Sequence, residues 1–269
     1  MSDDMARKRI VYDSPGMREV TLQRDLVYGN SADGNPLLMD LYHPAAVKGR
    51  AALPVVVFVA GYPDPGFSKV FGCRFKEMGA YVSWSELIAA SGMVAISYTN
   101  EQPVEDLSTL LRHLAEDAES LGIDAGRIGL WACSGNVPTA LAELIDDPSA
   151  GAIACAALCY GYMLDLDADT AVKDAAKTFG FATAISDMTA ADLNLSTPLL
   201  VVQAGKDQMP GINRTIDRFC VALLATDNAK LTRLNLPDAV HAFDLEQDSQ
   251  ASREAISEIV EFLKARLCG

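Results

Sequence analysis

Short runs of consecutive apolar residues recur along most of the chain, and segments of helical length separate them. Such near-continuous apolar runs are typical of strands that are covered on both faces in a parallel sheet. The predicted strands of this kind are 54–60, 93–98, 128–133, 152–160 and 198–205. The predicted helices between them are 84–91, 104–121, 135–145 and 211–225.

Both ends of the chain extend this pattern. Apolar and polar residues alternate over 18–28, a polar turn follows at 29–36, and 37–43 runs back, which predicts an antiparallel hairpin. The pattern of the C-terminal part of the chain predicts one more strand, 230–236, and a final helix, 251–267.

Strands that alternate with helices predict an α/β fold with right-handed crossovers. We expect a three-layer α/β/α sandwich around a mostly parallel sheet of about eight strands, formed by one domain over residues 1–269. Residues 1–17 are predicted to be a loose N-terminal arm. Residues 164–196, an irregular excursion between two predicted strands, are predicted to form a small cap over the carboxyl edge of the sheet.

Composition and charge exclude several classes of partner. The net charge of −14 argues against nucleic acid and anionic membrane surfaces, since both repel an acidic protein. The longest apolar run, 150–164, is shorter than the roughly 18 residues that a membrane span requires, and the N-terminus has no secretory signal pattern. We therefore expect a small-molecule partner, no nucleic acid, no membrane, and a possible homo-oligomer.

Six cysteines are spread along the chain without any CxxC pair or His/Cys cluster at metal-ligand spacing. In the absence of an export signal, we expect reduced cysteines and a cytoplasmic protein. No metal and no organic cofactor is predicted.

The stretch 127–141, RIGLWACSGNVPTAL, predicts a strand, a tight turn and a helix with Ser134 at the turn. A serine exposed at such a turn needs small residues two positions before and two after, because the strand and helix backbones approach closely. Ala132 meets this requirement, whereas Asn136 stands where glycine is usual. Ser134 is the predicted nucleophile; the alternative is a serine that caps the next helix.

A nucleophilic serine requires a general base, and histidine titrates in the useful range. Of the three histidines, His43 precedes Pro44 at the end of the hairpin and His113 lies within a predicted helix. His241 follows the last predicted strand and is the predicted base, with a purely structural loop histidine as the alternative.

The base requires an acid that orients it and stabilises its charged form. Asp207 follows the predicted strand 198–205, and we prefer it to Asp238, which lies three residues before His241. The acidic string Asp165, Asp167 and Asp169 is interpreted as a solvated charge run.

An acyl-transfer intermediate also requires two N–H donors for its oxyanion. One is predicted to be the amide of Gly135, directly after the serine. The other is the amide of Tyr62 in the turn 60–63, which follows the strand 54–60; the alternative is an ordinary Gly-Tyr-Pro turn.

Together these segments resemble the α/β-hydrolase family, in particular its small carboxylesterase and dienelactone-hydrolase-like branch. The resembling segments are 28–44 (YGNSADGNPLLMDLYHP), 54–61, 122–134 (GIDAGRIGLWACS) and 240–244 (VHAFD), with Ala60 where a histidine is usual. The resemblance implies the α/β-hydrolase fold, a Ser134, Asp207 and His241 triad, and oxyanion donors at Tyr62 and Gly135. Dienelactone hydrolases proper use a cysteine, but Cys133 in that role would place Trp131 where a small residue is needed.

The predicted activity is hydrolysis of small carboxylic esters by a serine hydrolase through an acyl-enzyme intermediate. The shortness of 164–196 favours small substrates over long-chain lipids. Two groups of residues are predicted either to line the substrate pocket or to belong to the core: Phe67, Phe71, Phe75 and Met78 after the oxyanion turn, and Tyr160 and Tyr162 after the strand 152–160. A peptidase, thioesterase or lactonase with the same triad, or a non-catalytic binding protein of the same fold, is the alternative.

Overall fold

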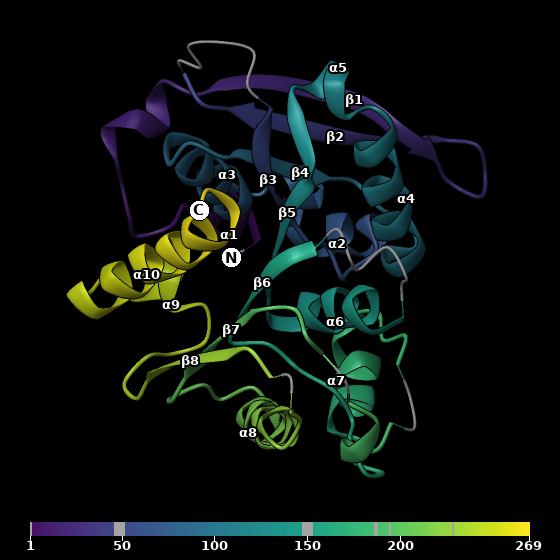
Figure 1. The fold of residues 1–269 in the computed structure, drawn as a ribbon, viewed down its shortest axis with the longest axis vertical. Helices are drawn as coiled ribbons and strands as arrows, with labels where there is room; N and C mark the ends of the chain where they lie inside the picture. Colours follow the sequence, from purple (N-terminus) through teal and green to yellow (C-terminus); the bar gives the residue numbers. More distant parts are fainter. Residues whose placement is uncertain (1, 46–51, 147–152, 186–187, 194, 228) are drawn as a thin grey trace.

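The computed structural model describes residues 2–45, 52–146, 153–185, 188–193, 195–227 and 229–269, and its described part contains an eight-stranded sheet (Figure 1). The strand order is β1-β2-β4-β3-β5-β6-β7-β8. The strands are β1 (Thr21–Asn30), β2 (Pro36–His43), β3 (Leu53–Phe58), β4 (Val94–Tyr98), β5 (Ile123–Cys133), β6 (Ile153–Cys159), β7 (Leu199–Ala204) and β8 (Leu231–Leu236).

The sheet is parallel from β4 to β8, and the β1–β2 hairpin joins it antiparallel through the pairing of β2 with β4. Residues of β3, β4 and β7 are buried almost without exception, as expected for strands covered on both faces. All parallel strands therefore end at one edge of the sheet, and residues that follow those ends are brought together there.

Helices cover both faces of this sheet (Figure 1). α3 (Gly79–Ala90) and α10 (Gln250–Leu267) pack on one face, and α4 (Pro103–Glu116), α6 (Val137–Asp146) and α8 (Ile212–Leu224) pack on the other. The leucine stripe of the predicted helix 104–121 faces the core: Leu107, Leu110 and Leu114 are fully buried. The three-layer α/β sandwich predicted from the sequence is thus confirmed.

The structure differs from the prediction mainly in short elements. The predicted helix 104–121 is broken at Asp117 into α4 and α5 (Ala118–Leu121), and α2 (Asp64–Phe71) and α9 (Phe243–Glu246) were not predicted. Three residues of the predicted cap (186, 187 and 194) and residue 152 of a predicted strand lie outside the described residues. Among the described residues, no helix has both the length and the apolar character that crossing a membrane requires.

The N-terminal arm, expected to be loose, is attached along its length. It begins with the helix α1 (Ser2–Arg7) and continues along α3, where the Ile10 N–H donates to the Ser83 hydroxyl at 3.1 Å. The Val11 N–H donates to the backbone carbonyl of Asp244 at 2.8 Å, and the Lys8 ammonium lies 2.7 Å from Glu246. These bonds anchor the arm beside the carboxyl edge of the sheet.

The excursion after β6 contains α7 (Ala171–Phe179) and the 3₁₀ turn η5 (Ala190–Asp192). Asp165 caps α7 by accepting the N–H groups of Val172 and Lys173, both at 2.8 Å. Asp169, interpreted from the sequence as solvated, is instead buried against the guanidinium groups of two arginines of α8. The acidic string is therefore structural.

Candidate active site

Ser134 lies directly after β5, at the start of the short 3₁₀ turn η3 (Ser134–Asn136) that leads into α6. Its φ of +54° is in the left-handed region, which costs a non-glycine residue on the order of 1–3 kcal/mol. Glycines make room for this turn: a Cβ on Gly161, after β6, would overlap Val137 and lie 3.0 Å from the Ser134 carbonyl. The chain thus holds Ser134 in a strained turn that projects its hydroxyl from the strand end.

His241 lies in the loop after β8 and faces this serine. The Ser134 Oγ and the His241 Nε2 are 3.0 Å apart. The imidazole and the Tyr160 ring pack in a T-shaped arrangement, with centroids 5.2 Å apart and the planes 74° to each other. The base predicted from the sequence therefore lies within hydrogen-bond reach of the predicted nucleophile.

Asp207 follows β7 and completes the chain of hydrogen bonds. Its Oδ2 lies 2.6 Å from the His241 Nδ1, and its side chain is fully buried. Its other oxygen, Oδ1, accepts the backbone N–H of Met209 at 2.9 Å. Both carboxylate oxygens are engaged, so the side chain has one fixed orientation toward the imidazole.

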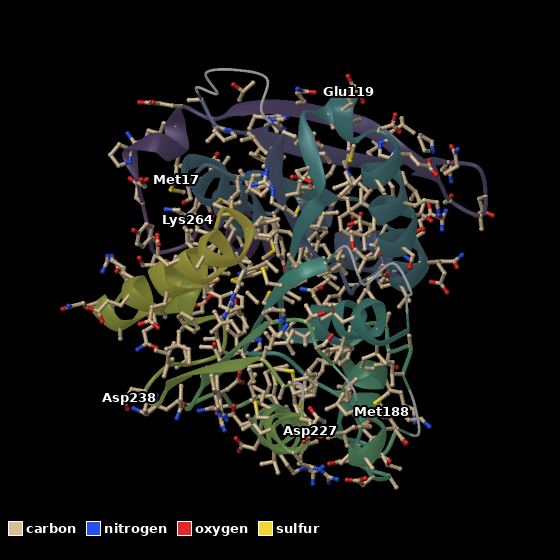
Figure 2. The ribbon with its side chains drawn as sticks, viewed as in Figure 1. Met17, Glu119, Met188, Asp227, Asp238 and Lys264 are labelled. Atoms are coloured by element: carbon tan, nitrogen blue, oxygen red, sulfur yellow. The ribbon has the colours of Figure 1, made fainter. Side chains whose placement is uncertain are left out.

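The side chains that we set aside lie elsewhere. Asp238 lies at the edge of the molecule (Figure 2), with 83% of its side chain exposed and Lys206 Nζ 2.7 Å away. His113 Nδ1 lies 3.0 Å from Asp117 on α4, and His43 is partly buried at the end of β2, which lowers the pKa of its imidazole.

The turn after β3 lies against the serine turn. A Cβ on Gly61 would lie 2.6 Å from both the Asn136 Cα and the Gly135 carbonyl oxygen, so only glycine allows this approach. The Gly61 N–H donates to the Asn136 side-chain oxygen at 2.7 Å, and the Ala60 N–H donates to the Tyr98 hydroxyl at 3.2 Å.

The carbonyl groups of this turn are also engaged. The Gly61 carbonyl accepts the Ala182 N–H at 2.8 Å, and the Tyr62 carbonyl accepts the Asn100 side-chain amide at 3.1 Å. The Tyr62 N–H makes no hydrogen bond within the described part of the chain. The Gly135 N–H belongs to the first turn of a helix, where backbone donors have no acceptor inside the helix.

Cys133, next to the serine, is buried and holds a protonated thiol. Burial raises its pKa to about 12, and its Sγ lies 3.6 Å from the Tyr81 hydroxyl. A thiol in such surroundings has almost no thiolate at neutral pH, and the thiolate is the reactive form. This environment disfavours Cys133 as a nucleophile.

A cavity of about 570 Å³ opens beside Ser134 and His241. Most of its wall is apolar or aromatic, and the wall includes Phe67 and Phe71 of α2 and Met5 of α1. Of the candidates for a pocket lining, Phe67, Phe71, Met78 and Tyr160 line this cavity, whereas Phe75 and Tyr162 are buried and are not part of its wall. A volume of this size is in the range of sites for small organic ligands.

One buried carboxyl in this wall was not anticipated from the sequence. Asp244, in α9, accepts the Trp84 indole N–H at 2.7 Å and the Tyr160 hydroxyl at 2.6 Å, and burial raises its pKa. The sequence offered one signal for this residue, its position three residues after His241. Its hydrogen-bond partners, Trp84 and Tyr160, lie on α3 and directly after β6. Only the fold reveals this network, which braces the loop that holds His241.

Among the described residues, no group of three or more His, Cys, Asp or Glu side chains is placed to hold a metal ion. All six cysteines are free thiols.

No protein-family model matches the chain, and no curated protein matches it significantly. Solved structures of esterases, in contrast, match nearly its whole length. A fungal esterase from Rhizomucor miehei superposes with a TM-score of 0.67 at 19% identity, over 93% of this chain and 85% of that one. The esterase Est2 of Thermogutta terrifontis gives 0.66 at 18% identity, over 93% and 94% of the two chains.

The esterase LipW of Mycobacterium marinum gives a TM-score of 0.67 at 16% identity, over 92% of this chain and 82% of that one. At these identities the likeness concerns the fold. The fold is that of the α/β-hydrolase esterases.

Proposed function

We propose that the protein is a serine esterase that cleaves small carboxylic esters through an acyl-enzyme intermediate. The proposal rests on the continuous hydrogen-bonded chain from Ser134 through His241 to the buried Asp207, which opens onto an apolar cavity. The likeness to esterase structures supports it. Assignment to the small carboxylesterase or dienelactone-hydrolase-like branch stays a prediction.

In the proposed mechanism, Ser134 Oγ attacks the ester carbonyl carbon while its proton passes to His241 Nε2. Asp207 accepts the hydrogen bond of the His241 Nδ1–H and stabilises the imidazolium that forms. The tetrahedral intermediate collapses, and His241 returns the proton to the departing alcohol. Water, deprotonated by His241, then attacks the acyl-enzyme and releases the carboxylic acid.

The developing oxyanion is assigned to the N–H groups of Gly135 and Tyr62. Each of the other N–H groups of the oxyanion turn has an acceptor within the protein, which leaves the Tyr62 N–H for the substrate. Donors that are fixed before the reaction stabilise the transition state without reorganisation, and losing one costs about 10²–10³-fold in kcat.

The cavity is the proposed site for the acyl group. Its wall includes two exposed apolar side chains, Val70 and Phe179, which favours an apolar acyl group over a charged one. Two structures of the Thermogutta terrifontis esterase, one with propionate bound and one phosphorylated by paraoxon, support a small acyl group and inhibition by organophosphates. The six free cysteines support the proposed cytoplasmic location.

A fluorophosphonate probe tests the proposal directly, because it reacts with an activated serine. We expect wild-type protein to be labelled and to hydrolyse p-nitrophenyl acetate, and Ser134→Ala to do neither. Ser85→Ala is the matched control, since it removes another buried serine hydroxyl, on α3, that makes no hydrogen bond within the described residues. Absence of labelling in folded wild type, or undiminished labelling of Ser134→Ala, would exclude the proposed function.

A further inference from the structure

Asn136 makes a hydrogen-bonded bridge between two turns of the site. Its side chain is 2% exposed, and its Oδ1 accepts the Gly61 N–H at 2.7 Å. Its Nδ2 donates to the Tyr81 hydroxyl at 3.1 Å and approaches the Cys133 Sγ at 3.7 Å. Every polar atom of this buried amide therefore has a partner, as a buried amide requires.

The partners of Asn136 also fix which way its amide points. The Tyr81 hydroxyl contacts both the amide NH₂ group and the Cys133 Sγ, the sulfur at 3.6 Å. Burial raises the pKa of the Tyr81 phenol and that of the Cys133 thiol, so both groups stay neutral. The Gly61 N–H can only donate, so the amide presents its oxygen to Gly61 and its NH₂ group to the lone pair of the Tyr81 hydroxyl.

The bridge controls the residue next to Gly61. The turn after β3 reaches the serine turn through Gly61, where two peptide planes meet. Asn136 holds the N–H of the Ala60–Gly61 peptide, and the Ala182 N–H holds the carbonyl of the Gly61–Tyr62 peptide. The second of these peptides also carries the Tyr62 N–H, so Asn136 acts on that N–H through the plane that precedes it. Because consecutive peptide planes share one Cα atom, a rotation of the Gly61 backbone would redirect that N–H.

We propose that Asn136 is a positioning residue that holds the oxyanion turn on the serine turn and thereby aims the Tyr62 amide at the oxyanion. This inference rests on the proposed function. It also accounts for the asparagine at a position where glycine is usual. A glycine at position 136 would leave the Gly61 N–H without its acceptor and would remove the hydrogen bond that joins the oxyanion turn to the serine turn.

Asn136→Gly tests the proposal, because it introduces the usual elbow residue and removes only the bridge. We expect kcat for p-nitrophenyl acetate to fall about 10- to 100-fold, with KM changed less than about 3-fold, since ground-state binding does not use the oxyanion contacts. Affinity for an aryl trifluoromethyl ketone, whose serine adduct bears an oxyanion, should fall by the same factor as kcat/KM. A purely structural defect would not produce this parallel.

Tyr81→Phe is the second variant, since it keeps the ring and the fold but removes the hydroxyl that orients the amide. We expect a smaller loss of kcat, about 3- to 10-fold, again matched by the trifluoromethyl ketone. Ser85→Ala is the matched control, because Ser85 is a buried hydroxyl on the same helix that makes no hydrogen bond within the described residues. It should leave both quantities unchanged.

Wild-type activity and labelling separate this inference from the proposed function. If wild type hydrolyses esters and Asn136→Gly keeps its kcat and its affinity for the ketone, the positioning role is overturned and the esterase stands. If Asn136→Gly does not fold, Tyr81→Phe decides, and wild-type values in that variant overturn the proposal. If wild type is neither labelled nor active, the proposed function itself fails.

Discussion

Replacement of Asp207 by asparagine changes one oxygen to an NH₂ group in a side chain that is fully buried. The Met209 N–H needs an acceptor, and Oδ1 of residue 207 is the atom that it contacts at 2.9 Å. The amide oxygen will therefore remain on that side, because the flipped amide would bring two donors face to face and leave a buried N–H unsatisfied, at a cost of about 1–3 kcal/mol. The new NH₂ group then faces His241 Nδ1, 2.6 Å away from the present oxygen.

An NH₂ group in that place can only donate, so the imidazole must accept at Nδ1 and carry its proton on Nε2. Nε2 is the atom that lies 3.0 Å from Ser134 Oγ. A protonated Nε2 cannot accept the serine proton, and only the minor tautomer remains competent. We expect kcat to fall by about 10⁴-fold, which is about 5 kcal/mol of transition-state stabilisation.

The assay is the hydrolysis of p-nitrophenyl acetate, with kcat and KM measured separately and the fold checked by thermal unfolding. The rate of fluorophosphonate labelling should fall together with kcat, because both report the nucleophilicity of the serine. Asp238→Asn is the matched control: it makes the same chemical change in an aspartate 83% exposed that contacts Lys206. It should leave kcat within about 2-fold, as is usual for an exposed pair.

Retention of more than about a tenth of kcat in folded Asp207→Asn would refute the tautomer argument. An equal loss in Asp238→Asn would refute the choice of Asp207 over Asp238.

Four other changes test separate parts of the site. Tyr62→Phe keeps the backbone N–H and should change kcat less than about 3-fold, whereas a loss near 10²-fold would assign the oxyanion contact to the phenol. Cys133→Ala should stay active, and wild type should resist iodoacetamide from about pH 7 to pH 10, because the pKa of about 12 keeps the thiol protonated there; rapid inactivation would contradict this. Met5→Trp narrows the cavity and should lower kcat/KM for p-nitrophenyl octanoate about 10-fold with little effect on the acetate; equal losses for both esters would argue against the cavity as acyl site. Gly161→Ala forces a methyl group into Val137 and should reduce the free energy of unfolding by about 1–3 kcal/mol, measured in urea; an unchanged value would show that the turn can relax.

Several features of the fold follow from the sequence because they depend on local pattern. A strand covered on both faces must be apolar along its length. The apolar runs that form β3 to β7 can therefore be recognised as strands from the sequence alone, without knowledge of their neighbours in the sheet. The side chains of Ser134, Asp207 and His241 each follow a strand of one parallel sheet. Their proximity follows from that topology, since all parallel strands end at the same edge.

The short helix α2 and the attachment of the N-terminal arm could not be predicted from local sequence pattern. α2 contains proline and glycine within eight residues and has little helical pattern of its own, so its helix depends on packing against its surroundings. The N-terminal arm reads as polar and irregular, and its attachment depends on acceptors that the fold supplies, such as the carbonyl of Asp244.

The sequence by itself determined that a mostly parallel sheet forms, the succession of strands and helices along the chain, and the three side chains that follow strand ends. Apolar runs and positions after a strand can be recognised from neighbouring residues alone. The order of the strands within the sheet came from the structure. Only the tertiary structure decided how the site is braced. The Gly61 N–H finds its acceptor in Asn136, 75 residues away, and Asp244 finds its donor in Trp84, 160 residues away. Such pairs depend on distances between atoms of different elements, and no local pattern encodes them. In the sequence, Asn136 departs from the glycine usual in the serine turn, and only the tertiary structure shows that its side chain bonds the oxyanion turn.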